Sequence, residues 1–158
     1  MLKLPKTIKM VITDFDGIIT DNCVYIDDNF NMSRKINFKD IMAFAILKRN
    51  NIKIGIISGE GNGAIEALAK KFQIEEIHQK IRVKIDILND ILKKHNLTEE
   101  EFVYIGDDIN DYDCLCFAKY KVTVPHAVKK IRQIDGIQIT ESKAGEGAFR
   151  EVADCLTD

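Results

Sequence analysis

Polar and acidic side chains follow three apolar segments of the chain, at the point where each segment ends. The three clusters read DFDG at 14–17, SGE at 58–60 and GDDIND at 106–111. Carboxylates that lie close together repel one another, and this repulsion raises their pKa values. A divalent cation removes that penalty, and a site of few oxygen ligands suits magnesium, which also meets substrate phosphate. If the clusters meet, the sequence predicts a magnesium site for a phosphate group. Helix caps and turns would account for one cluster but not for three.

The elements that must position these clusters alternate between strand-like and helix-like segments. Strands are predicted over 8–13, 52–57, 74–79, 102–105, 120–124 and 137–140, and helices over 40–50, 62–72, 82–95, 111–118, 126–133 and 147–157. The run Thr98–Glu101 also predicts a helix N-terminus with acids in its first turn. Alternation of this kind favours a largely parallel sheet with helices on both faces. Ligands bind beyond the carboxyl ends of such strands, so we expect the three clusters to converge there.

The composition narrows the class of protein. The chain has 158 residues, 46% of them hydrophobic and 30% charged, with a formal net charge of −2. These values predict a single globular domain over residues 1–158. They argue against nucleic acid as the main partner, because phosphate backbones are bound by an excess of Lys and Arg. No apolar run approaches the roughly 18 residues of a membrane span, and residues 1–6 do not resemble a signal peptide. We therefore expect a cytoplasmic protein whose four cysteines are reduced.

The motifs resemble those of the haloacid dehalogenase superfamily. The stretches DFDGIITD, IISGE and GDDIND, together with the lysine at position 84, are similar to its four motifs and occur in the same order. The resemblance extends over nearly the whole chain. It implies a Rossmann-like sheet and a magnesium-dependent reaction that proceeds through a phosphorylated aspartate.

The resemblance assigns roles to the acidic residues. Asp14 matches the nucleophile that forms an aspartyl phosphate. Asp16 matches the general acid and base, and its backbone carbonyl would also bind magnesium. Asp107 matches the magnesium-ligating acid, so Asp14, Asp16 and Asp107 form the expected metal set. Asp108 and Asp111 would support that set as outer residues or through water.

Phosphate binding is assigned to three further residues. Ser58, with Gly59, matches the second motif, whose hydroxyl hydrogen-bonds the transferring phosphoryl group, and Lys84 matches the lysine that neutralises charge. Lys84 opens the predicted helix 82–95, as the lysine of the family does, although Val83 replaces the usual Asp before it. The same window also holds Lys80, Lys93 and Lys94. Phosphoryl transfer depends mainly on such charge neutralisation and in-line positioning.

Residues 23–38 predict a β-hairpin, because apolar residues flank a turn at Asp27–Asn29. Many members of the superfamily carry a separate cap domain that selects the substrate. Here one hairpin and one helix occupy the interval between Asp16 and Ile57, which leaves no room for such a cap. We therefore expect an α/β, Rossmann-like, three-layer parallel sheet with a hairpin flap, and a neighbouring subunit that closes the site.

Further features resemble the 3-deoxy-D-manno-octulosonate 8-phosphate phosphatase family. They are the DxDGxxTD start, the hairpin, NFKD at 37–40, GDDIND and the tail AGEGAFREV at 144–152. A related phosphatase acts on 2-keto-3-deoxy-D-glycero-D-galacto-nononate 9-phosphate. The octulosonate enzymes form tetramers. The resemblance therefore implies a homotetrameric phosphatase for a phosphorylated sugar acid, in lipopolysaccharide or sialic acid biosynthesis.

Three residues carry a finer hypothesis about the substrate. The octulosonate enzymes usually have Gly-Arg after the hydroxyl of the second motif. This chain has Gly59-Glu60 there, which is similar to the Gly-Glu of the nononate phosphatase, and Lys71 also matches a lysine of that enzyme. Arg150 would meet the sugar's carboxylate, in its own or a neighbouring subunit. The structural alternatives are that Glu60 caps the next helix and that Arg150 makes a surface ion pair. Asp21 is expected to shape the entry to the hairpin.

Two other functions stay open beside the phosphatase. A non-catalytic domain could assemble with a sialic acid cytidylyltransferase, but a chain of that kind has no reason to keep both Asp14 and Asp16. A phosphotransferase or mutase would need cap residues for a second phosphate, which the chain lacks. The sequence also departs from the family at Ile41 and Ala144, where glycine is usual, and these changes bear on closure around the substrate.

Overall fold

A six-stranded parallel sheet forms the centre of the computed structural model, which describes all residues from 1 to 158. The strand order is β5-β4-β1-β6-β7-β8. The strands are β1 (Met10–Thr13), β4 (Lys53–Ile57), β5 (Glu76–His78), β6 (Phe102–Ile105), β7 (Tyr120–Thr123) and β8 (Gln138–Ile139). In the register, Thr13 lies opposite Ile56 on one side and Ile105 on the other. The residues that follow β1, β4 and β6 therefore emerge together at one edge of the sheet.

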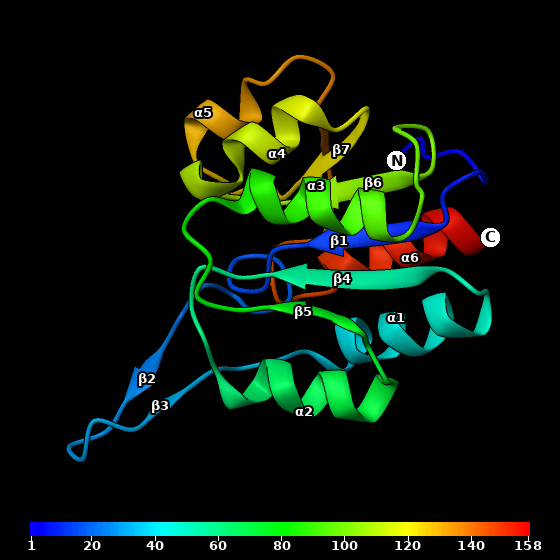
Figure 1. Ribbon diagram of the computed structural model, residues 1–158. Coiled ribbons are helices and arrows are strands. Elements are labelled where there is room, and N and C mark those ends of the chain that lie inside the picture. The colour runs from blue at the N-terminus through cyan, green and yellow to red at the C-terminus, as the bar shows by residue number, and fades with distance from the viewer.

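Helices cover both faces of this sheet (Figure 1). They are α1 (Phe38–Arg49), α2 (Gly63–Phe72), α3 (Lys84–Lys94), α4 (Tyr112–Phe117), α5 (Lys129–Arg132) and α6 (Ala148–Thr157), with a short 3₁₀ turn η1 (Ile109–Asp111) before α4. Every residue of β1 and β6 is buried, as expected of strands covered on both sides. Phe44 of α1 stacks on Phe72 of α2 and contacts Phe149 of α6, with ring centroids 5.4 and 4.8 Å apart. The predicted α/β fold class is confirmed.

Asp40 joins α1 to the start of α6. Its buried carboxylate accepts hydrogen bonds from the backbone N–H groups of Gly147 and Arg150, at 3.0 and 3.1 Å. The first N–H groups of a helix have no partner within the helix, so an acid supplied from another helix caps them. Asp40 therefore has a structural reason for its place in the NFKD stretch.

The predicted hairpin is present but short. Its strands are β2 (Tyr25–Ile26) and β3 (Met32–Ser33), and it extends away from the body of the molecule (Figure 1). A bridge between Thr20 and Ile36 closes its base. Apolar side chains along it lie in solvent, with Phe30 87% exposed and Ile26 64% exposed. The hairpin therefore exposes several large apolar side chains together.

The prediction of a helix N-terminus at Thr98–Glu101 was wrong. Strand β6 begins at Phe102, so only a turn fits between α3 and β6. The Glu101 carboxylate accepts hydrogen bonds from the backbone N–H and the hydroxyl of Thr98, at 3.0 and 3.1 Å, and pairs with Lys9. The acid thus closes the turn instead of occupying a first helical turn.

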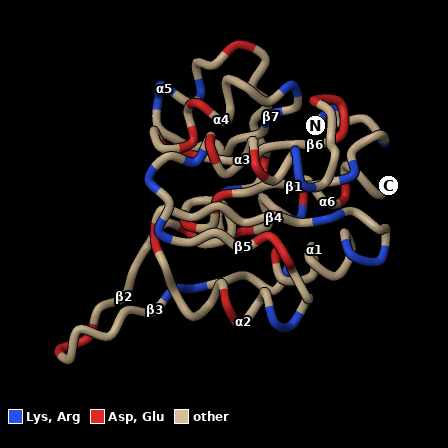
Figure 2. Tube along the Cα trace, viewed as in Figure 1, with Lys and Arg blue, Asp and Glu red and all other residues tan.

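Charges of both signs are interspersed along the chain (Figure 2). No helix is both long and apolar enough to cross a membrane.

Candidate active site

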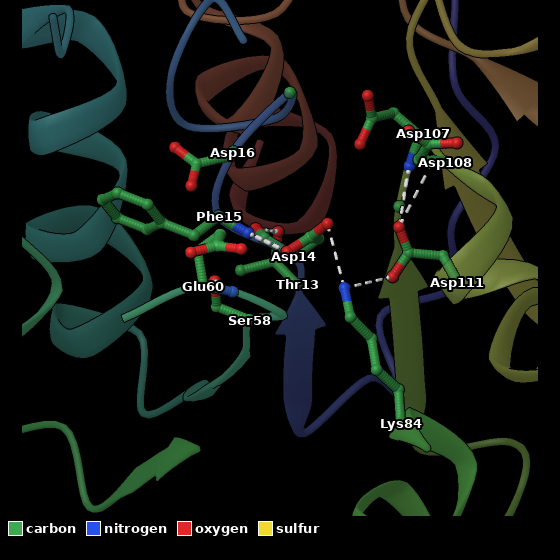
Figure 3. A network of polar contacts seen from close by, with 12 residues as sticks. Thr13, Asp14, Phe15, Asp16, Ser58, Glu60, Lys84, Asp107, Asp108 and Asp111 are labelled. Carbon is green, nitrogen blue, oxygen red and sulfur yellow. Dashed lines mark hydrogen bonds and ion pairs between the residues drawn. The ribbon is translucent and has the colours of Figure 1, made fainter. Parts of the chain in front are cut away.

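The three polar clusters meet at the carboxyl edge of β1, β4 and β6 (Figure 3). The backbone N–H of Asp14 donates to the carbonyl of Ile105, and that of Ser58 donates to the carbonyl of His78, which continues the ladders by one residue. Together the clusters line a hollow of about 250 Å³ without a single apolar residue. Its lining consists of Asp14, Asp16, Asn22, Ser58, Gly59, Glu60, Asp107, Asp108 and Asn110. Such a wall suits a strongly polar ligand.

Lys84 lies between two carboxylates at the floor of the site (Figure 3). Its Nζ is 2.9 Å from Asp14 Oδ2 and 2.8 Å from Asp111 Oδ1, and its side chain is fully buried. Burial alone would lower the pKa of Lys84, but the charges of Asp111 and Asp14 raise it above its usual value. Lys84 is therefore charged, and it begins α3 as the sequence predicted.

Asp111 has no free oxygen for a metal ion. Its Oδ1 accepts from Lys84 and from the Tyr104 hydroxyl, both at 2.8 Å. Its Oδ2 accepts from the backbone N–H groups of Asp107 and Asp108, at 3.2 and 3.4 Å. Asp111 thus orients Lys84 and the loop after β6, which supports its predicted place outside the metal set. Tyr104 was missed, because its position in the apolar run FVYI gives no signal beyond a buried strand.

Asp107 has the properties of a metal ligand. Burial, followed by the nearby charges of Asp111 and Asp108, raises the pKa of Asp107 to about 7. Its Oδ1 is buried without any hydrogen-bond partner. Gly17, with φ of +88°, faces this carboxylate, and a Cβ there would overlap it. A buried carboxylate oxygen without a hydrogen-bond partner is explained by a bound cation.

The donor set fits a small divalent cation. Oxygens of Asp14, Asp107 and Asp111 lie within 4.8 Å of one another, and all three residues are buried. Because the Asp111 oxygens are engaged, Asp14 and Asp107 are the residues that would hold the ion. Burial and the charge of Asp111 also raise the pKa of Asp14 well above its usual value, against the opposing effect of Lys84. A bound cation would restore the charged form of both carboxylates.

Asp16 lines the hollow, with its carboxylate directed away from Lys84 (Figure 3). Its Oδ1 accepts hydrogen bonds from the Thr20 hydroxyl at 3.0 Å and from Arg34 Nε at 2.8 Å. Sequence reasoning did not find Arg34. The only available signal was a basic residue in the returning arm of the hairpin, which also fits a solvated face.

Residues 58–60, which resemble the second motif of the superfamily, line the same hollow as Asp14 and Asp107. The Ser58 hydroxyl is buried in the hollow and accepts a hydrogen bond from the Glu60 backbone N–H at 3.3 Å. Gly59 faces Asn110, so that a Cβ at position 59 would lie 3.2 Å from Asn110 Nδ2. Asn22 and Asn110 line the hollow and were not among the predicted site residues.

Within one chain, two predicted substrate residues lie outside the hollow. Lys71 is in the last turn of α2, exposed, with Nζ 5.5 Å from the ring centroid of Phe72. Arg150 pairs with Asp154 at 2.6 Å and lines a separate hollow near the two termini. Asp21 pairs with Lys35 at 2.7 Å at the entry to the hairpin. Roles for Lys71 and Arg150 in substrate binding would require the site of another subunit, and they stay predictions.

Comparison with known proteins defines the class. The family model of haloacid dehalogenase-like hydrolases matches residues 35–115, about half of the chain and including Ser58, Lys84 and Asp107. The chain therefore belongs to this family and is a hydrolase, which confirms the predicted superfamily and the prediction of an enzyme.

More specific relatives share almost the whole chain. The 3-deoxy-D-manno-octulosonate 8-phosphate phosphatase KdsC of Salmonella typhi is 28% identical over 152 residues, which are 96% of this chain and 80% of that protein. The corresponding enzyme of Escherichia coli K12 is 27% identical over the same shares.

Solved structures agree with these relatives. The 3-deoxy-D-manno-octulosonate 8-phosphate phosphatase of Moraxella catarrhalis, in complex with magnesium ion, phosphate ion and KDO molecule, has a TM-score of 0.90 and 28% identity, covering 96% of this chain and 86% of that one. The cobalt-bound enzyme of Haemophilus influenzae has a TM-score of 0.88 and 25% identity, covering 96% and 88%. The predicted resemblance to this group of phosphatases is confirmed.

Proposed function

We propose that this protein is a magnesium-dependent phosphatase for a phosphorylated 2-keto-3-deoxy sugar acid. One observation carries the proposal. A buried carboxylate, Asp14, contacts a buried charged lysine, Lys84, beside the unpartnered oxygen of Asp107, at the edge of a hollow lined only by polar residues and glycine. The names of the relatives support the choice of a phosphate ester as substrate.

The reaction would run in two displacements at phosphorus. An Asp14 oxygen attacks phosphorus, the bond from phosphorus to the sugar oxygen breaks, and that oxygen takes a proton from Asp16. Water then attacks the aspartyl phosphate, gives a proton to Asp16 and releases Asp14 with inorganic phosphate. Ser58, Gly59 and Lys84 hold the phosphoryl group. Magnesium would be held by Asp14, by the backbone carbonyl of Asp16 and by Asp107. It would neutralise the negative charge of the carboxylates and of the phosphate.

Two sugar acids are candidates for the natural substrate. The relatives act, by their names, on 3-deoxy-D-manno-octulosonate 8-phosphate. Glu60, which lines the hollow where those enzymes usually have an arginine, favours a nine-carbon acid such as the nononate 9-phosphate.

We also infer that the chain is a single domain which works as a homotetramer. The hairpin carries Tyr25, Ile26 and Phe30 into solvent, and the open hollow has no cap of its own. A neighbouring subunit would cover both. Such packing would also give Lys71 and Arg150 a route to a substrate.

Phosphate release from defined esters tests the proposal. The purified protein with magnesium is expected to release phosphate from at least one of octulosonate 8-phosphate, nononate 9-phosphate and N-acetylneuraminate 9-phosphate. The Asp14→Asn variant removes the nucleophile and should release none, whereas Asp28→Asn, in the exposed turn of the hairpin, should match the wild type. Equal and negligible release from all three esters by wild type and Asp14→Asn would refute the phosphatase and favour a non-catalytic assembly domain.

A further inference from the structure

Arg34 connects the hairpin to the proposed acid–base residue. It follows β3, and its side chain is only 6% exposed although most of the hairpin lies in solvent. Its Nε donates to Asp16 Oδ1 at 2.8 Å, and this is the only hydrogen bond that the guanidinium makes within the chain. Withdrawal of a guanidinium from water is costly unless a partner compensates it. Arg34 is thus committed to a single oxygen of a single carboxylate.

Thr20 contacts the same oxygen, and its hydroxyl can be oriented from its other contacts. Thr20 Oγ1 accepts from the backbone N–H groups of Gly17 and Asn22, both at 3.3 Å. Its own proton is therefore free to point to Asp16 Oδ1, 3.0 Å away. Asp16 Oδ1 receives two hydrogen bonds, while Oδ2 receives none from the chain.

This arrangement distinguishes the two oxygens of Asp16. An oxygen that already accepts from a guanidinium and a hydroxyl is a poor place for a proton, because the proton would face two donors. When Asp16 is protonated, the proton belongs on Oδ2. Asp16 also lines the hollow where the ester would bind.

We propose that Arg34 is a positioning residue for the acid–base step: together with Thr20 it holds Asp16 Oδ1, so that Oδ2 gives and takes the proton. The proposal rests on the phosphatase function. In the first displacement the bond from phosphorus to the ester oxygen breaks, its electron pair goes to that oxygen, and the Oδ2 proton moves onto it. In the second, the attacking water returns a proton to Oδ2.

Leaving-group dependence separates this role from a structural one. A sugar alkoxide leaves only when protonated, and phenolate leaves poorly without a proton, whereas p-nitrophenolate is a stable anion that leaves unaided. General acid–base catalysis contributes roughly 10²–10⁴-fold, and Thr20 remains in the variant. Hydrolysis of the aspartyl phosphate is the same step for every ester, whereas kcat/KM reports the first displacement alone. Arg34→Met should therefore lower kcat/KM about tenfold for octulosonate 8-phosphate and for phenyl phosphate. It should lower kcat/KM less than about twofold for p-nitrophenyl phosphate.

Several controls sharpen the measurement. The ratio of the rates for two esters in one sample does not depend on how much of the variant is folded. Arg34→Lys should restore part of the ratio, because an ammonium can donate to Oδ1. Lys35→Met removes the next cation, which pairs with Asp21 instead, and should leave the ratio at the wild-type value. In an Asp16→Asn background, Arg34→Met should cause no further loss.

The outcomes are distinguishable. Equal loss of kcat/KM for all esters in Arg34→Met, or no loss for any, overturns the positioning role. An additive loss in the Asp16→Asn background overturns it too. A wild type that cleaves the aryl esters but no sugar acid phosphate contradicts the proposed substrate, and the phenyl to p-nitrophenyl ratio still decides the role of Arg34. A wild type that cleaves no ester overturns both.

Discussion

Gly17 leaves open the space that the carboxylate of Asp107 occupies. Gly17 belongs to the loop after β1 and Asp107 to the loop after β6, and a Cβ on Gly17 would overlap the Asp107 carboxylate. The positive φ of Gly17, +88°, is also a conformation that other residues avoid. The loops after β1 and β6 can therefore approach each other this closely only if position 17 has no side chain.

Gly17→Ala should abolish most of the activity while the protein still folds. The new methyl group must displace Asp107, because both the space and the backbone conformation are unfavourable. We expect kcat/KM to fall by about 100-fold or more, since a 1 Å displacement at a reacting site costs about that much. Gly63→Ala is the matched control, because a Cβ at Gly63 meets nothing within 4 Å. Activity near wild type in Gly17→Ala would contradict the role of Asp107 in the site.

A buried carboxylate far from the hollow gives a pH-dependent prediction. Glu76 of β5 is 2% exposed and contacts Lys94 at 2.6 Å, His95 at 2.8 Å and His78 at 2.9 Å. Burial alone would raise the pKa of Glu76, but hydrogen bonds from Lys94, His78 and His95 lower it from 4.5 to about 2. A carboxyl whose pKa is lower in the folded state stabilises the fold above its unfolded pKa. This contribution is lost as the pH falls from about 4.5 to about 2.

Glu76→Gln should therefore destabilise the protein near neutral pH and much less in acid. We expect a loss of roughly 2 kcal/mol in the free energy of unfolding at pH 7, less than the full shift implies because Lys94 is exposed and screened. Urea denaturation at pH 7 and at pH 3 measures the difference in the free energy of unfolding between the variant and the wild type. Glu75→Gln, at the exposed neighbouring position, should change neither value. A loss that is the same at both pH values would contradict the charge-based account.

Part of this site could be predicted because parallel strands share one edge. The order of DFDG, SGE and GDDIND after three buried runs was enough to place Asp14, Ser58 and Asp107 together, since adjacent parallel strands end side by side. Lys84 could be chosen from its place at the start of a helix.

Contacts between segments that are distant in the sequence could not be predicted in this way. The pairing of Arg34 with Asp16 depends on how the base of the hairpin folds back, and the bond from Tyr104 to Asp111 depends on how η1 turns over β6. Neither leaves a periodic or compositional signal. The Thr98–Glu101 turn was mistaken for a helix start because both use the same residue types.

Asp40→Ala tests the link between α1 and α6. The variant removes the acceptor for the Gly147 and Arg150 N–H groups, and loss of a helix cap costs about 1–2 kcal/mol. Asp40→Asn keeps one acceptor oxygen and should lose less. Asp28→Ala, which changes an exposed acid in the hairpin, is the control. Urea unfolding curves for the four proteins give the comparison, and an Asp40→Ala midpoint equal to that of the wild type would show that α6 needs no such cap.

The exposed apolar surface of the hairpin predicts its role in assembly. Ile26→Glu combined with Phe30→Asn places a charge and a polar group where apolar contacts between subunits are proposed. Asn tolerates the positive φ of 64° that Phe30 has, so the hairpin itself should persist. Light scattering during size-exclusion chromatography should report four chain masses for the wild type and for Asp28→Asn, and a smaller mass for the double variant. A wild-type monomer with full phosphatase activity would refute the tetramer.

Glu60 gives the sharpest test of which sugar acid the site prefers. Its backbone N–H donates to the Ser58 hydroxyl, so its side chain starts next to the phosphate end of the hollow. A carboxylate there accepts hydrogen bonds from sugar hydroxyls, whereas an arginine would bind an anionic group. Glu60→Arg should therefore shift the ratio of kcat/KM for octulosonate 8-phosphate over nononate 9-phosphate upwards by about tenfold, the value of one charge-assisted contact.

The comparison needs a variant with the same charge change elsewhere. Glu66 lies on the exposed face of α2, outside the hollow. Glu66→Arg therefore changes the net charge by the same amount as Glu60→Arg without changing the hollow. It should leave the substrate ratio at the wild-type value, because long-range charge acts equally on two substrates that both carry a phosphate and a carboxylate. If Glu60→Arg and Glu66→Arg gave the same ratio, the side chain at position 60 would not contact the sugar. If Glu60→Arg instead raised kcat/KM for nononate 9-phosphate relative to octulosonate 8-phosphate, the substrate preference inferred from position 60 would be wrong.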